Sequence, residues 1–106
     1  MDTDELIKHS RARFDHAAAR RVIKEKYQAK LLFAHCGGMF RACPETITFL
    51  SLYPAEEIVI LDEYETPVKV QADVLCEIMK TRWQEQMNAW LVEHEQTKQN
   101  RWHAAH

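Results

Sequence analysis

The sequence predicts a mostly α-helical protein of the α+β class, built around a long antiparallel helical hairpin. Three observations support this prediction. Two long segments place apolar residues at helical spacing without an internal helix breaker. The 106 residues include only two glycines and three prolines, fewer than a loop-rich or all-β fold uses. Between the long segments lie two short β-branched runs, and the chain length indicates a single domain, residues 1–106.

The second long helix is expected at about residues 72–99. Residues 71–101 would form a rod of about 45 Å at ~1.5 Å per residue, which a small globule cannot cover, so another long element must lie along it. The chain end, residues 100–106, is expected to fray. The apolar side chains of this helix recur at spacings of three and four and include Val74, Leu75, Ile78, Met79, Trp83, Met87, Trp90 and Leu91.

The first long helix is expected at about residues 3–36. Asp2, Asp4 and Glu5 place negative charge at its start, which suits the positive end of the helix dipole. Gly37 and Gly38 follow its last turn, and glycine ends helices in a left-handed conformation, so the helix is predicted to stop there. Its apolar surface is wide and partly lined by alanine, which favours close packing against the second long helix.

A short helix and a β-hairpin are predicted between the long helices. Pro44 suits the first position of a helix over about residues 44–53, which ends before Pro54. The runs 57–61 and 67–70 flank a polar connection and predict a two-stranded hairpin over residues 57–70. A lone hairpin is marginally stable in water, so one of its faces is expected to rest on a helix.

Charge and cysteine content limit the compartment and the partners. The net charge is −2, but residues 1–35 carry +3, residues 36–70 carry −4 and residues 71–106 carry −1. No apolar run long enough for a membrane span and no signal peptide is present, which indicates a protein that stays in its cytoplasm of origin. The three cysteines, Cys36, Cys43 and Cys76, are expected to be free thiols.

The sequence gives little support for catalysis, a metal or a cofactor. His35, Cys36 and Cys43 form the only cluster with metal-binding chemistry, but they lack the closely spaced ligand pairs of a zinc site. Ser10 and Ser51 lack the surroundings of a catalytic nucleophile. The carboxylates near residues 56–57 and 62–65 fit an exposed turn. We therefore expect no enzyme activity, no metal and no cofactor.

Four sequence blocks resemble small uncharacterised proteins of large T4-like tailed bacteriophages, including cyanophages. The blocks are residues 18–30, residues 33–39 apart from Cys36, residues 65–70 and residues 82–91. The resemblance implies a phage source, and hence a place in a virion, in its assembly, or in an action on a host protein. The expected location is the cytoplasm of a bacterial host or the phage particle.

The function expected from the sequence is a non-enzymatic structural or assembly role through protein–protein contacts. Trp83, Met87 and Trp90 form a stripe of residue types that are enriched at interface centres, so we expect self-association through this stripe. The hairpin edge from Val68 to Val70 is expected to contribute. Two alternatives are a small phage regulatory factor that binds one host protein and a nucleic-acid-binding factor. The second would use the basic first helix, although its charges lie on several faces.

Overall fold

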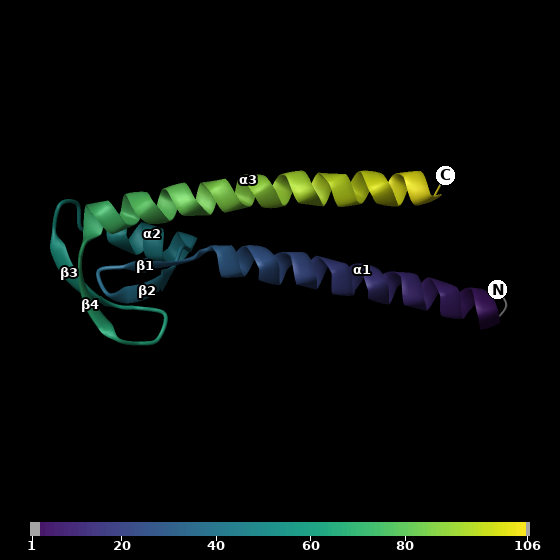
Figure 1. Cartoon of the computed structure of the whole chain (residues 1–106), viewed down its shortest axis with the longest axis horizontal. Helices are drawn as coiled ribbons and strands as arrows, with labels where there is room; N and C mark the ends of the chain where they lie inside the picture. Colours follow the sequence, from purple (N-terminus) through teal and green to yellow (C-terminus); the bar gives the residue numbers. More distant parts are fainter. Residues whose placement is uncertain (1–2, 106) are drawn as a thin grey trace.

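The computed structural model describes the backbone of residues 3–105 and the side chains of residues 3–8 and 15–98. The mixed helix and strand class and the long C-terminal helix expected from the sequence are confirmed (Figure 1). In chain order the elements are α1 (Thr3–Lys30), β1 (Leu32–His35), β2 (Gly38–Arg41), α2 (Pro44–Ser51), β3 (Glu57–Leu61), β4 (Pro67–Gln71) and α3 (Ala72–Ala105).

The molecule is elongated, with a small head at one end and two long helices leaving it on the same side (Figure 1). Its principal extents are 64 × 24 × 21 Å, and its radius of gyration is 19.7 Å. A compact domain of this length has a radius of gyration of about 13 Å. Helices α1 and α3 approach each other near the head and separate toward the chain ends. We call the parts of α1 and α3 that lie outside the head the arms.

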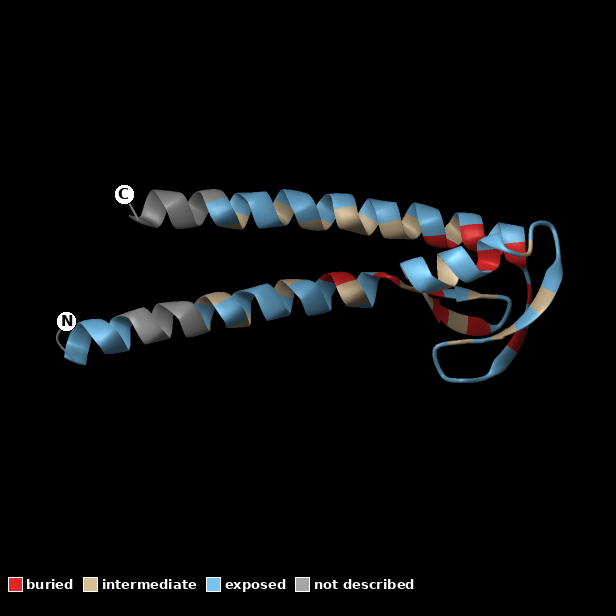
Figure 2. Cartoon of the chain, turned by 180° about the vertical axis from the view of Figure 1, so that it is seen from behind, coloured by how far each residue is buried: buried red, intermediate tan, exposed pale blue. Residues whose placement is uncertain are grey.

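The core lies in the head, where α2, the two β-hairpins and the first turns of α3 meet (Figure 2). The side chains of Leu31, Leu50, Val70, Leu75 and Met79 are the largest that are almost fully buried. The arms are mainly exposed, apart from a buried position close to the end of α1. The head therefore supplies most of the apolar burial that stabilises the fold.

Residues 32–41 form a second β-hairpin, so the prediction that the first helix reaches residue 36 is wrong. Strands β1 and β2 are antiparallel, with Phe33 opposite Phe40 and His35 opposite Gly38. Both residues of the two-residue connection have a positive φ, 50° at Cys36 and 81° at Gly37, as a type I′ turn requires. Burial of Phe33 and Phe40 in the head overrides the helical spacing of this segment.

Two arginine side chains, not a glycine, bind the carbonyl groups at the end of α1. Arg41 donates from Nη1 to the carbonyl oxygen of Gln28 at 2.9 Å, and Arg82 donates from Nη1 to that of Lys30 at 3.2 Å. Cationic groups at this position also interact favourably with the negative end of the helix dipole. The helix can therefore end at Lys30, seven residues before the first glycine.

The two β-hairpins form separate two-stranded antiparallel sheets that touch at Gly38. A Cβ added at Gly38 would lie 2.8 Å from Cγ2 of Val68, so only glycine allows this close approach. Strand β3 pairs with β4 in the register Ile58 to Val70 and Ile60 to Val68. The inward face of this second hairpin thus packs on the core.

Two helix ends differ from the sequence-based boundaries. Helix α2 ends at Ser51, since the backbone N–H groups of Leu52 and Tyr53 bond to carbonyl groups three residues earlier, a tighter turn than an α-helix makes. The backbone of α3 is helical through Ala105, although residues 100–106 are expected to fray. Residue 106 lies outside the described residues. No residue from 72 to 105 is a proline or a glycine, so no breaker ends the helix earlier.

Candidate interaction surfaces

A cluster of four side chains joins α1 to α3 just outside the head. Tyr27 is 4% exposed, and its ring stacks on that of Trp90 with centroids 5.7 Å apart and planes 6° apart. Its hydroxyl group donates to Oε2 of Glu93 at 2.5 Å. Lys26 forms an ion pair with the same carboxylate at 3.1 Å. We call Lys26, Tyr27, Trp90 and Glu93 the arm clasp, because they hold the arms together.

The charges of the arm clasp support one another. The hydrogen bonds from Tyr27 and Lys26 hold the pKa of the Glu93 carboxyl below its ordinary value. The hydrogen bond to Glu93 also raises the pKa of the Tyr27 phenol. The ammonium groups of Lys26 and Lys30 lie 5.2 and 5.1 Å from the centroid of the Tyr27 ring, which is a cation–π distance. The clasp is therefore held by both aromatic and ionic contacts.

The predicted stripe of Trp83, Met87 and Trp90 makes contacts within the monomer. Trp83 and Met87 are partly buried and pack against the core of the head, and Trp90 belongs to the arm clasp. All three remain partly exposed along the inner side of α3. A role of this stripe in binding a second chain stays a prediction, but substitution of any of the three is expected to affect the monomer first.

Val68 and Val70, which the sequence suggests as part of the interaction surface, lie in the core. Their side chains are 9% and 1% exposed and face Ile60 and Ile58 across the sheet. These side chains cannot contact a partner unless the head opens, so this part of the predicted surface is corrected. The reason is the two-residue period of a strand: the positions that alternate with Val68 and Val70, such as Lys69, point outward.

The outer face of β3 carries large apolar side chains that the described part of the chain leaves exposed. Val59 and Leu61 are each 62% exposed, and they lie beside Phe49 and Leu52 of the α2 region, which are 44% and 69% exposed. Glu45, Phe49 and Leu61 line a shallow depression between α2 and β3. We call Phe49, Leu52, Val59 and Leu61 the apolar head surface.

The sequence of β3 already contains the signal for this surface. A strand that is covered on one face alternates apolar and polar residues, whereas residues 58–61 are Ile, Val, Ile and Leu without interruption. Such a run is typical of a strand that is buried on both faces. In this structure Ile58 and Ile60 pack against the core, and the intervening side chains face outward.

The arms also expose apolar residues beyond the arm clasp. Val22 on α1 is 64% exposed, and Leu91 and Val92 on α3 are 55% and 56% exposed. Leu6 and Ile7 are exposed near the start of α1. Helix α1 is basic, with eight Lys or Arg residues against four Asp or Glu residues, whereas residues 31–71 of the head contain two against six. The molecule thus has a basic arm and an acidic head.

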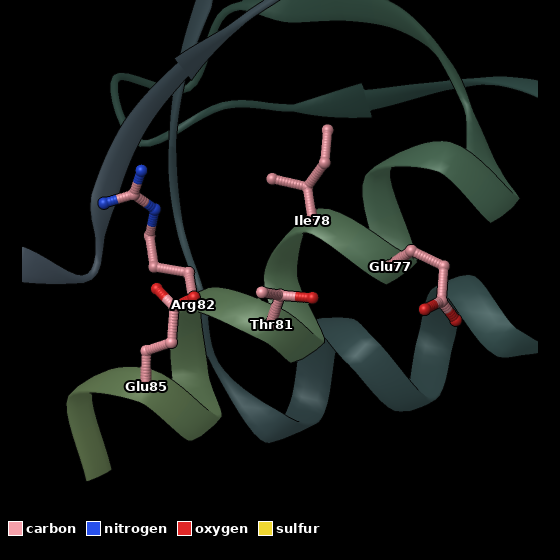
Figure 3. Close-up of a pocket in the computed structure, with 5 residues that line it drawn as sticks. All are labelled: Glu77, Ile78, Thr81, Arg82 and Glu85. Carbon is pink, nitrogen blue, oxygen red and sulfur yellow. The ribbon is translucent and has the colours of Figure 1, made fainter. Parts of the chain in front are cut away.

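A second depression lies on the surface of α3 next to the head, with a volume of about 330 Å³ (Figure 3). It is lined by Ile78, Thr81 and Arg82, with Glu77 and Glu85 at its margins. The guanidinium group of Arg82 lies 5.4 Å from the Phe33 ring centroid and binds the end of α1, so its role is structural. The lining comes from a single helix and includes no pair of groups in acid–base contact.

The side chains that could bind a metal are dispersed. Among the described residues, no group of three or more His, Cys, Asp or Glu side chains is arranged to hold a metal ion. Cys36 is exposed in the type I′ turn, Cys43 lies next to Thr46 with Sγ 3.0 Å from Oγ1, and Cys76 is buried. These three thiols are all free.

Comparisons with known proteins identify no relative of this chain: no family model, no curated protein and no solved structure matches it. Within the part of the chain that the structure describes, no helix combines the length and the apolar character needed to cross a membrane.

Proposed function

We propose that this protein is a non-enzymatic structural or assembly protein that acts through protein–protein contacts and associates with itself. The observation that carries the proposal is a large excess of surface. The chain has 7990 Å² of accessible surface, whereas a compact monomer of 12.5 kDa has about 6,200 Å². The excess of about 1,800 Å² is comparable to the area that two standard interfaces take from one partner, at about 800 Å² each.

The positions of the exposed apolar residues support the same proposal. They lie at both ends of the molecule, on the arms at Val22, Leu91 and Val92 and on the apolar head surface. Large apolar patches on soluble proteins mark sites that another molecule covers. In the assembled state, we propose, the arms close along their length into an antiparallel helical hairpin, because contacts with a second chain would fill the space between their separated ends.

The resemblance to proteins of T4-like tailed phages supports a place in a phage particle or in its assembly. An elongated protein with helical arms can bridge neighbouring subunits, and charge of opposite sign at its two ends can orient it. The biological setting in this proposal is the cytoplasm of a bacterial host or the virion.

Sedimentation velocity and light scattering at tens of micromolar protein test the proposal directly. The expected result is a mass of at least twice 12.5 kDa that falls on dilution. A mass of one chain over the whole concentration range would contradict self-association and would favour the alternative of a small regulatory factor that binds one host protein. Binding of DNA or RNA with a steep salt dependence would instead favour the nucleic-acid alternative.

A further inference from the structure

We infer that the apolar head surface is the docking site for the α1 arm of a second copy of this chain. This inference rests on the proposed function, because it names the surfaces through which self-association occurs. It starts from β3, whose outward side chains Val59 and Leu61 belong to a run typical of a strand covered on both faces. The described chain covers only the inner face of this strand.

Charge around the apolar head surface selects a basic partner. Glu45 borders the depression between α2 and β3, and Glu57 lies on the same face of β3 as Val59 and Leu61. Both carboxylates are exposed, and the head as a whole has two basic residues against six acidic residues. A partner that combines apolar side chains with positive charge would neutralise this face and cover its apolar centre.

The α1 arm has that combination. Val22 is 64% exposed, and the neighbouring Arg21 and Lys24 are also exposed. The helix has a surplus of four positive charges, and an amphipathic helix that lies against an apolar surface is a common mode of recognition. Within one chain the arm extends away from the head, so its outer side cannot reach the apolar head surface (Figure 1). The docked arm must therefore come from another copy.

Two copies can make this contact twice, because each copy has one arm and one head. Reciprocal contacts of this kind close a two-fold symmetric dimer, the commonest arrangement of homo-oligomers. Two contacts per copy, each taking about 800 Å² from that copy, also match the surface excess of about 1,800 Å². The area and the charge thus point to the same occupant.

A charge-exchange experiment tests this arrangement. One variant carries Glu45→Lys and Glu57→Lys on the head, and another carries Arg21→Glu and Lys24→Glu on the arm. Each variant alone should associate about tenfold or more weakly than the wild type at low salt, because like charges then face each other. A mixture of the two variants should restore association, since both contacts of a mixed dimer again pair opposite charges. All four substitutions on one chain should restore it as well.

The matched control reverses two charges outside the apolar head surface, Glu77→Lys and Glu85→Lys on α3, where both residues line the other depression. This variant should associate like the wild type, and circular dichroism should show unchanged helix content in every variant. If the wild type associates but the head and arm variants associate equally well, or if mixing them restores nothing, the docking inference is wrong and the proposed function stands. A monomeric wild type would overturn both.

A second pair of variants tests the apolar part of the contact. Val59→Ser with Leu61→Ser should weaken association without unfolding the head, because both side chains already face solvent in the single chain. Val22→Ser on the arm should have a similar effect. Retention of full association by both variants would show that another surface holds the copies together.

Discussion

The carboxylate of Asp62 binds the backbone of Met39, with Oδ2 3.0 Å from the amide nitrogen, and so connects the two β-hairpins of the head. The backbone N–H of Glu63 donates to the carbonyl oxygen of Met39 at 2.7 Å and completes this connection. The other carboxylate oxygen of Asp62 accepts the N–H groups of Tyr64 and Thr66, each at 2.9 Å. One side chain thus forms the turn between β3 and β4 and fixes it to β2.

Asp62→Ala is expected to lower the melting temperature, because it leaves three backbone N–H groups without this acceptor. The N–H groups of Thr66 and Met39 lower the pKa of Asp62, so its stabilising effect is present above the ordinary carboxyl pKa. The effect should disappear as the pH falls through the lowered value. Melting curves from pH 7 to pH 2 should therefore show a wild-type advantage that shrinks in acid. Glu65→Gln, a change in the same turn, is the control and should leave the curves nearly unchanged.

Gly38→Ala is expected to destabilise the head by about 1–3 kcal/mol, as overpacking of a well-filled site does. The added Cβ would lie 2.8 Å from Cγ2 of Val68. Denaturant unfolding measures the effect, and a double-mutant cycle with Val68→Ala identifies its cause. The cost of Gly38→Ala should be smaller in the Val68→Ala background. Equal costs in both backgrounds would show that this contact is not the reason.

Leu50→Ala is expected to cost about 2–5 kcal/mol of unfolding free energy, because it leaves a cavity in the core. The Leu50 side chain has no exposed surface. Leu52→Ala makes the same chemical change two residues later, where the side chain is 69% exposed, and should change stability by about 0.5 kcal/mol or less. Similar effects of the two substitutions on denaturant unfolding would contradict the placement of the core.

Trp83→Ala is expected to cost about 3 kcal/mol, because this side chain packs against the core of the head. Trp90→Ala removes the stacking partner of Tyr27 and should instead separate the arms while the head remains folded. Amide hydrogen exchange distinguishes the two outcomes. In the Trp90 variant the loss of protection should be confined to the arms, whereas in the Trp83 variant it should include β1 and β2.

Glu93→Gln is expected to weaken the arm clasp at neutral pH and to matter less in acid. The folded state lowers the pKa of Glu93, so the carboxylate stabilises the clasp above its ordinary pKa and loses this effect as the pH falls through the lowered value. The melting temperatures of the wild type and the variant should therefore converge between neutral pH and about pH 3. Glu95→Gln, an exposed change on the same helix, serves as the control. A constant difference between wild type and Glu93→Gln at all pH values would exclude this role.

The elements that the sequence predicts well are those with a strong local pattern. The spacing of Leu75, Met79 and Trp83 indicates a helix, and residues 57–61 and 67–70 indicate strands, without reference to the rest of the fold. Residues 32–41 follow a different rule, because the β-hairpin there depends on burial of Phe33 and Phe40 against residues distant in the sequence. Gly37 was interpreted as a helix cap, yet the same positive φ serves a type I′ turn.

The candidate surfaces were less accessible from sequence. The Trp and Met stripe of α3 has the composition of an interface, but it faces α1 and the head within the monomer. Tyr27 and Glu93 are 66 residues apart, so no local pattern reveals their hydrogen bond. The uninterrupted apolar run of β3 is the one signal that could have revealed the apolar head surface.

The place of the arm clasp makes each long helix a lever. Helix α1 is fixed at its end by Arg41 and Arg82 and held again at Tyr27, and it then extends for about 36 Å to Thr3 at ~1.5 Å per residue. A tilt of about 5° at the clasp would move that free end by about 3 Å, close to the width of an atom. Small changes in the packing of Tyr27 on Trp90 are thus enlarged at the far end of the molecule, where a neighbouring subunit would feel them.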